Sequence, residues 1–192
     1  RPGDCTPKPV QLHLIIREAL KLVRPSFPST IVIQDELDEQ CSPVLADPTQ
    51  VHQVIMNLFT NAFHAMREGG GTMDVRLTSL QVTNESEVRN LGLEEGHYAC
   101  VTVCDTGHGM DEVVMTQIFD PLFTTKGPGE GTGLGLATAH GIVASHGGAI
   151  SVESHPGAGT RFDVYLPCDA TLELDVNVPQ SRPASGGEES IL

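Results

Sequence analysis

Residues 119–141 read FDPLFTTKGPGEGTGLGLATAHG and place five glycines among the nine residues 127–135, directly before a segment with helical character. Ordering glycine is entropically costly, so such a cluster indicates backbone that takes positive φ or approaches another group closely. A plain surface loop is the alternative for a glycine segment considered alone. Other patterns in the chain are needed to distinguish a backbone that approaches another group from a plain surface loop.

One such pattern lies on a helix predicted to begin at Pro48. Asp47 is suited to the N-cap, Pro48 to the first helical position, and Gln50 follows the cap by three residues. The helix has an apolar stripe (Val51, Val54, Ile55, Leu58, Ala62, Met66) and a polar side (Gln53, Asn57, Asn61, His64). Asparagine is unfavourable inside helices, and a neutral amide oxygen can bind Mg²⁺ without competing with phosphate charge. Two solvent-facing amides remain the alternative.

The third pattern is DTGHGM, residues 105–110, at the end of a predicted strand. The Asp105 carboxylate could accept a hydrogen bond from the exocyclic amine of adenine, whereas guanine would present a repelled carbonyl oxygen. Gly107 and Gly109 would let the backbone lie close to a flat ring. An Asx-turn that merely ends the strand is the alternative.

The remaining elements follow from hydrophobic periodicity and turn residues. Helices are expected at 10–24, 48–66, 111–117 and 133–146. Strands are expected at 30–37, 72–82, 97–105, 149–154 and 160–166, the last two forming a hairpin around HPGAG. This order predicts an α+β fold, an α/β sandwich in which helices cover one face of a mixed, mostly antiparallel sheet.

Composition narrows the possible partners. The 192 residues carry a formal charge of −14, which argues against a nucleic acid or an anionic membrane surface. Five cysteines without a CxxC pair argue against a disulfide framework, and Cys100 and Cys104 are expected to be small buried side chains of one strand. No apolar run approaches about 20 residues, and we expect a cytoplasmic location.

Two common phosphate-binding motifs do not fit the glycine segment. A P-loop places its glycines before the lysine, but Lys126 precedes them here, and no GxGxxG is found in the chain.

Five ordered motifs instead resemble one family: NLFTNAFHAM, DTGHGM, FDPLFTTK, GTGLGLA and SHPGAGTRFDVYLP. They are similar to the N, G1, F, G2 and closing glycine boxes of the ATP-binding catalytic (HATPase) domain of sensor histidine kinases. That domain has the Bergerat-type fold shared with gyrase, the Hsp90 chaperones and mismatch-repair MutL. The resemblance covers about residues 10–167.

The resemblance implies ATP and Mg²⁺ as cofactors and assigns roles to residues of this chain. Asn61 would bind the metal, Asn57 would lie beside the triphosphate, and both would be catalytic together with Lys126. The implied nucleotide contacts are Asn57, Asn61, His64, Asp105, Gly107, Gly109, Met110, Phe119, Thr125, Lys126, Gly131, Thr132, Gly133, Leu134, Gly135 and Thr160. Residues 119–131 resemble the lid over the nucleotide, with Lys126 as a phosphate contact. Gly131, Gly133, Leu134 and Gly135 resemble the backbone cradle of the phosphates at a helix N-terminus.

Two departures from the superfamily bear on mechanism. Hydrolytic members have a glutamate one turn before the metal asparagine, where this chain has Asn57, so we expect slow hydrolysis. The family often has a basic residue three positions after that asparagine. His64 stands there, and a phosphate role for it is a hypothesis.

The expected function is transfer of the ATP γ-phosphate to a histidine of a dimerisation domain, in two-component signalling that continues to a response-regulator receiver domain. None of the eight histidines has the neighbours of a phosphoacceptor, so the chain resembles the catalytic part alone and should not autophosphorylate by itself. Residues 1–9 would follow the dimerisation helices, and residues 168–192 would be a linker that leads toward a receiver domain. We expect a monomer without direct membrane contact. A non-catalytic nucleotide sensor and a slow stand-alone ATPase are the alternatives.

Overall fold

The computed structural model describes residues 7–83, 92–125 and 133–172. A five-stranded sheet has the order β2-β4-β5-β7-β6, and a two-stranded sheet pairs β1 with β3. The strands are β1 Lys8–Val10, β2 Ile31–Leu37, β3 Val44–Ala46, β4 Gly71–Val82, β5 Gly96–Asp105, β6 Ala149–His155 and β7 Gly159–Pro167. The helices are α1 Leu12–Val23, α2 Pro48–Met66, α4 Glu112–Met115 and α5 Gly135–Ser145, with a 3₁₀ turn at Arg24–Ser26.

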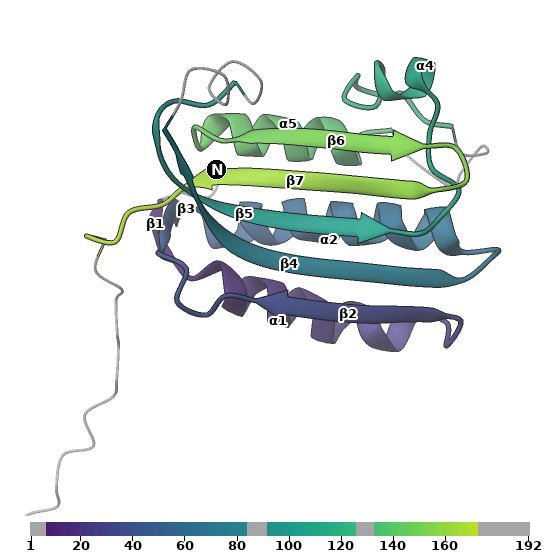
Figure 1. Cartoon of the computed structure of the whole chain (residues 1–192), viewed down its shortest axis with the longest axis horizontal. Helices are drawn as coiled ribbons and strands as arrows, with labels where there is room; N and C mark the ends of the chain where they lie inside the picture. Colours follow the sequence, from purple (N-terminus) through teal and green to yellow (C-terminus); the bar gives the residue numbers. More distant parts are fainter. Residues whose placement is uncertain (1–6, 84–91, 126–132, 173–192) are drawn as a thin grey trace, which may run out of the picture.

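The main sheet is mixed, because β2 pairs with β4 in parallel and every other pair is antiparallel. Helices α1, α2 and α5 lie behind this sheet in Figure 1, all on the same face. The side chains between the two layers form one core, in which Ile16, Phe59 and Met73 are fully buried. The expected sandwich is therefore confirmed.

The structure differs from the sequence-based expectations in three elements. The first helix begins at Leu12 rather than residue 10, because Val10 belongs to β1 and pairs with Val44. The small β1–β3 sheet was not expected. The second long helix begins at Gly135, two residues later than expected.

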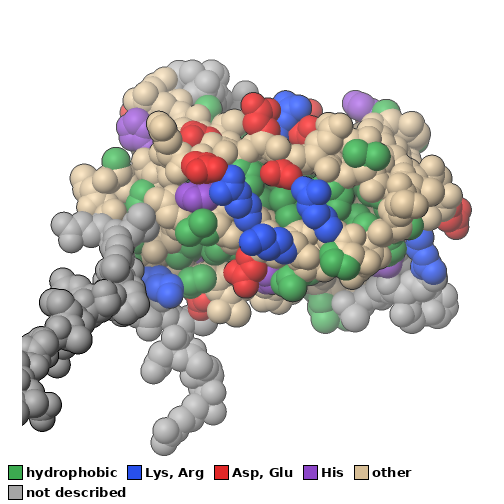
Figure 2. Space-filling view, turned by 90° about the horizontal axis from the view of Figure 1, so that it is seen from below, with side chains coloured by type: hydrophobic (Ala, Val, Ile, Leu, Met, Phe, Trp, Pro, Cys, Tyr) green, Lys and Arg blue, Asp and Glu red, His purple; other side chains and the backbone are tan. Residues whose placement is uncertain are grey.

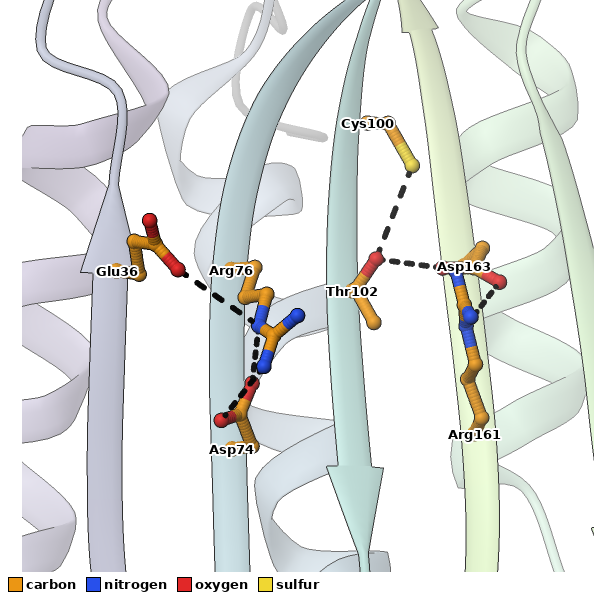
Figure 3. Close-up of polar contacts among 7 residues, drawn as sticks. All are labelled: Glu36, Asp74, Arg76, Cys100, Thr102, Arg161 and Asp163. Carbon is orange, nitrogen blue, oxygen red and sulfur yellow. Dashed lines mark hydrogen bonds and ion pairs between the residues drawn. The ribbon is translucent and has the colours of Figure 1, made fainter.

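The face of the sheet away from the helices is largely polar. Figure 3 shows Arg76 beside Asp74 and Arg161 beside Asp163, with nitrogen–oxygen distances of 2.7 and 2.8 Å. Thr102 donates to Asp163 at 2.5 Å. Cys100 and Cys104 both lie on this face. Cys100 is buried, as expected, in a small cluster with Val82 and Tyr165, whereas Cys104 lies outside that cluster and is only half-buried.

Two ion pairs lie along the β2 edge of the sheet. Arg24 of the 3₁₀ turn contacts Asp35 of β2 at 2.7 Å, and Arg17 of α1 contacts Glu39. Seen from this edge, Figure 2 shows Lys and Arg side chains lying among acidic ones over a partly hydrophobic surface. None of the helices in the described ranges has both the length and the hydropathy of a bilayer-spanning segment.

Candidate functional site

Helix α2 has the start that its sequence predicts. The Asp47 side chain accepts hydrogen bonds from the backbone N–H groups of Thr49 and Gln50, at 2.8 and 3.4 Å. The apolar stripe is buried along its whole length, together with Phe59. Burial of that stripe fixes the rotation of the helix, so the side with Asn57 and Asn61 turns away from the core.

One edge of α2 joins the other two segments singled out by the sequence. Asn57 donates from Nδ2 to the carbonyl oxygen of Gly135, at the first residue of α5, over 2.9 Å. Two turns later, the Ala65 carbonyl accepts a hydrogen bond from His108 N–H at 3.2 Å. Residues 57, 61 and 65 recur every four positions and so share this edge. Asn61 therefore lies between the start of α5 and the turn that follows β5.

Asp105, the last residue of β5, is a buried carboxylate with 5% of its surface exposed. Its Oδ1 accepts the Gly107 N–H at 2.8 Å. Burial raises the pKa of Asp105 above its usual value, and hydrogen bonds from the Gly107 and Thr160 backbones partly offset that rise. Such a group gains from a ligand that donates a hydrogen bond to its ionised form.

The glycines of this turn allow close packing. A Cβ on Gly107 would lie 2.6 Å from both the Cβ and the carbonyl oxygen of Ala65. Gly109 has a φ of +65°, and a Cβ there would lie 2.0 Å from the His155 carbonyl oxygen. The turn is thus wedged between α2 and the β6–β7 hairpin, and only glycine fits at either position.

A polar row crosses the helix-facing side of the sheet beside Asp105. Asp105 pairs with Thr160 of β7, and Thr160 pairs with Ser154 of β6. The Ser154 hydroxyl accepts the Met110 N–H at 2.8 Å, donates to the Gly159 carbonyl at 3.0 Å and contacts Thr160 Oγ1 at 2.9 Å. Sequence reasoning missed Ser154. A serine that shares the inward parity of a strand is the signal that could have found it.

The structure describes only part of the glycine segment 127–135. Lys126, Gly131 and Thr132 lie outside the described residues. Gly133 has a φ of +66°, and its carbonyl oxygen accepts a hydrogen bond from Leu122 N–H at 3.0 Å. This bond joins the residues that precede the glycine segment to those at its end. Leu134 follows as the N-cap of α5 and is 44% exposed.

Of the other residues implied by the resemblance, Phe119 stacks obliquely on His140 with 5.0 Å between ring centroids. His64 lies 5.5 Å from Phe63 by the same measure. Thr125 is exposed and is the last described residue before the glycines.

A second contact joins the start of α2 to the end of α5. The Asp47 N–H donates to His146 Nε2 at 3.2 Å, and His146 Nδ1 lies 2.8 Å from the Ile142 carbonyl. In this arrangement Nδ1 donates to that carbonyl and Nε2 accepts, so the two bonds fix the orientation of the ring.

Comparisons with known proteins show which family this chain resembles. A sequence model of the family described as histidine kinase-, DNA gyrase B-, and HSP90-like ATPase matches residues 46–170. The sensor histidine kinase ZraS of Salmonella typhimurium is 35% identical over 168 residues, which are 87% of this chain and 32% of that protein. The sensor kinase CckA of Brucella abortus is 42% identical over 125 residues, which are 65% of this chain and 13% of that protein.

Among solved structures, the catalytic domain of histidine kinase ThkA superposes with a TM-score of 0.66 at 29% identity, covering 84% of this chain and 95% of that one. The chain thus spans about a third or less of the curated relatives described above, but nearly the whole of that isolated domain. The expected resemblance and fold are both confirmed. The chain belongs to the family of histidine kinase-, DNA gyrase B- and HSP90-like ATPases.

Proposed function

We propose that this chain is the catalytic domain of a sensor histidine kinase, which binds Mg-ATP and directs the γ-phosphoryl group to a histidine on a dimerisation domain. The observation that supports this most is the arrangement along α2. The buried Asp105 turn packs at one end of its polar edge, the start of α5 is bonded to Asn57 at the other, and Asn61 lies between them.

The residues around Asp105 suit an adenine ring. A buried carboxylate with two backbone donors still has lone pairs to accept an amine N–H. Gly107 and Gly109 keep the neighbouring backbone free of side chains, and Met110 packs as a partly buried apolar residue next to them. Thr160 would contribute a hydroxyl oxygen from the adjacent strand.

The residues at the start of α5 suit the phosphate end. Gly133, Leu134 and Gly135 would direct backbone N–H groups toward an anion, and Asn57 fixes the carbonyl of Gly135 away from it. Asn61 would supply a neutral oxygen to Mg²⁺. Phe119 and Thr125 would belong to the lid over the nucleotide, and Lys126 would contact the phosphates. Gly131 would join the phosphate cradle, Thr132 would be a further nucleotide contact, and His64 would face the phosphates.

In this proposal the bound Mg-ATP supplies the phosphoryl group, while the metal neutralises its charge. The chain itself binds and orients. Asn57 is not a base, and its amide is engaged with Gly135, so no side chain at that position activates water. The acceptor imidazole of another domain is the nucleophile, and slow hydrolysis follows.

The domain limits and partners belong to the same proposal. Residues 10–167 would be the catalytic domain, and residues 168–192 a linker toward a receiver domain. The chain would act in the cytoplasm as a monomer, with a dimerisation domain and then a response-regulator receiver as partners. It would act on that histidine only when the dimerisation domain is supplied.

Mixing the chain with γ-labelled ATP and a separately purified dimerisation domain tests the proposal. We expect label on that domain in a linkage labile to acid and stable to base, and none when the phosphoacceptor histidine is replaced. ATP binding without transfer would favour a nucleotide sensor. Steady phosphate release without label would favour a stand-alone ATPase.

A further inference from the structure

The three contacts of the Ser154 hydroxyl determine in which of them it donates and in which it accepts. Its hydroxyl is 3% exposed and has three partners within 3.0 Å: Met110 N–H, the Gly159 carbonyl and Thr160 Oγ1. A hydroxyl has one proton and two acceptor sites. The proton goes to the Gly159 carbonyl, because a carbonyl can only accept. The two acceptor sites then take the Met110 N–H and a proton from Thr160.

This arrangement decides which way the Thr160 hydroxyl faces. Because its proton is given to Ser154, Thr160 Oγ1 can offer only lone pairs to any other partner. Asp105 lies next to Thr160 in the same cross-strand row, and an ionised carboxylate is also only an acceptor. The row thus presents two neighbouring acceptors and no side-chain donor.

We propose that Ser154 is a specificity-determining positioning residue, which holds the Thr160 hydroxyl as an acceptor so that the site selects purines with an exocyclic amine over purines with a carbonyl at that position. This inference rests on the proposed nucleotide function of the same site. Ser154 does not touch the nucleotide and acts through Thr160. Its bond to Met110 N–H also ties the turn after β5 to the β6–β7 hairpin.

Binding of ATP and GTP to the whole chain, measured by titration calorimetry, tests the role of Ser154. In Ser154→Ala the Thr160 hydroxyl is free to rotate and donate to the guanine carbonyl. We expect the ratio of ATP to GTP affinity to fall about threefold to tenfold, the factor for one neutral hydrogen bond. Ser151→Ala is the matched control, because Ser151 lies on the same strand but pairs with Asp163 on the opposite face. Its ratio should not change.

A double-mutant cycle separates positioning from general loosening of the fold. In a Thr160→Val background, which has no hydroxyl to orient, adding Ser154→Ala should leave the ATP to GTP ratio unchanged. A general loss of stability would weaken both nucleotides in either background. If Ser154→Ala does not fold, Ser154→Cys serves in its place, because the thiol is close in size and a weak hydrogen-bonding group.

The outcomes distinguish this inference from the proposed function. A wild-type chain that binds neither nucleotide overturns the proposed function. A wild-type chain that prefers ATP, with the same preference in Ser154→Ala, overturns only the role of Ser154. An equal fall of the ratio in the Thr160→Val background also overturns it, because Ser154 would then act by another route.

Discussion

Replacing Asp105 with Asn tests the proposed role of the buried carboxylate in binding the adenine amine, with almost no change in shape. The carbonyl oxygen of the introduced amide can keep the 2.8 Å bond from Gly107 N–H, so the turn should stay in place. The other carboxylate oxygen is replaced by an NH₂ group, which faces the adenine amine donor to donor. Losing a hydrogen bond to a charged acceptor costs about 1.5–3 kcal/mol, which corresponds to ATP binding weaker by about 10- to 150-fold.

The same replacement should act in the opposite direction on a 6-oxo purine. Inosine triphosphate presents a carbonyl oxygen, to which the new NH₂ group can donate. We therefore expect Asp105→Asn to bind inosine triphosphate at least as tightly as the wild type does. Titration calorimetry of the wild type and Asp105→Asn with ATP and inosine triphosphate measures these affinities. Equal losses for the two, or unchanged ATP binding, would refute the assignment of Asp105 as the amine acceptor.

The raised pKa of Asp105 predicts the direction in which stability and ATP affinity change with pH. Burial raises the pKa of Asp105 in the folded protein, so the cost of the ionised carboxylate is present above that pKa and is relieved as the pH falls through it. Asp105→Asn removes this cost. Its melting temperature should therefore equal or exceed that of the wild type near neutral pH, and the difference should close in acid. The ATP affinity of the wild type should fall more steeply with acidification than that of Asp105→Asn.

Three further replacements test other parts of the site. In Asn61→Ala, ATP affinity should lose its dependence on Mg²⁺ and phosphotransfer should disappear; unchanged Mg-ATP binding by calorimetry would show that the metal ligand lies elsewhere. Gly107→Ala should lower stability by about 1–3 kcal/mol through overpacking, because its Cβ would lie 2.6 Å from Ala65, whereas Gly69→Ala, with nothing within 4 Å, should be tolerated in the same thermal melts. Asp47→Ala should cost about 1 kcal/mol, or about 2–4 °C in melting temperature, and leave ATP affinity unchanged; a matching loss of affinity would contradict a capping role alone.

Sequence reasoning succeeded where the determining interactions are local. The start of α2 needs only Asp47 and its next three residues, and the burial of its stripe follows from helical spacing. The turn after β5 was recognisable because its glycines alternate with polar residues directly after an apolar strand. Local rules of this kind also gave the five main strands within one or two residues.

The features that the sequence did not predict depend on contacts between residues far apart in the chain. Strands β1 and β3 have three residues each and pair across more than 30 positions, so neither shows a pattern of its own. Val10 was assigned to the first helix because it is an apolar residue two positions before Leu12, in the same uninterrupted segment. The role of Ser154 emerges only when β6, β7 and β5 are placed side by side, since its partners come from three segments.

The two hydrogen bonds that join α2 to the start and the end of α5 have a mechanical consequence. Asn57 holds the start of α5 and His146 holds its end, so the two helices resist sliding or pivoting relative to each other. If the chain acts as proposed, in-line transfer of a phosphoryl group needs the bound nucleotide to be held in a fixed position. The paired helices would hold it so, and binding and release of nucleotide should then require rearrangement of other segments while the spacing of α2 and α5 stays constant.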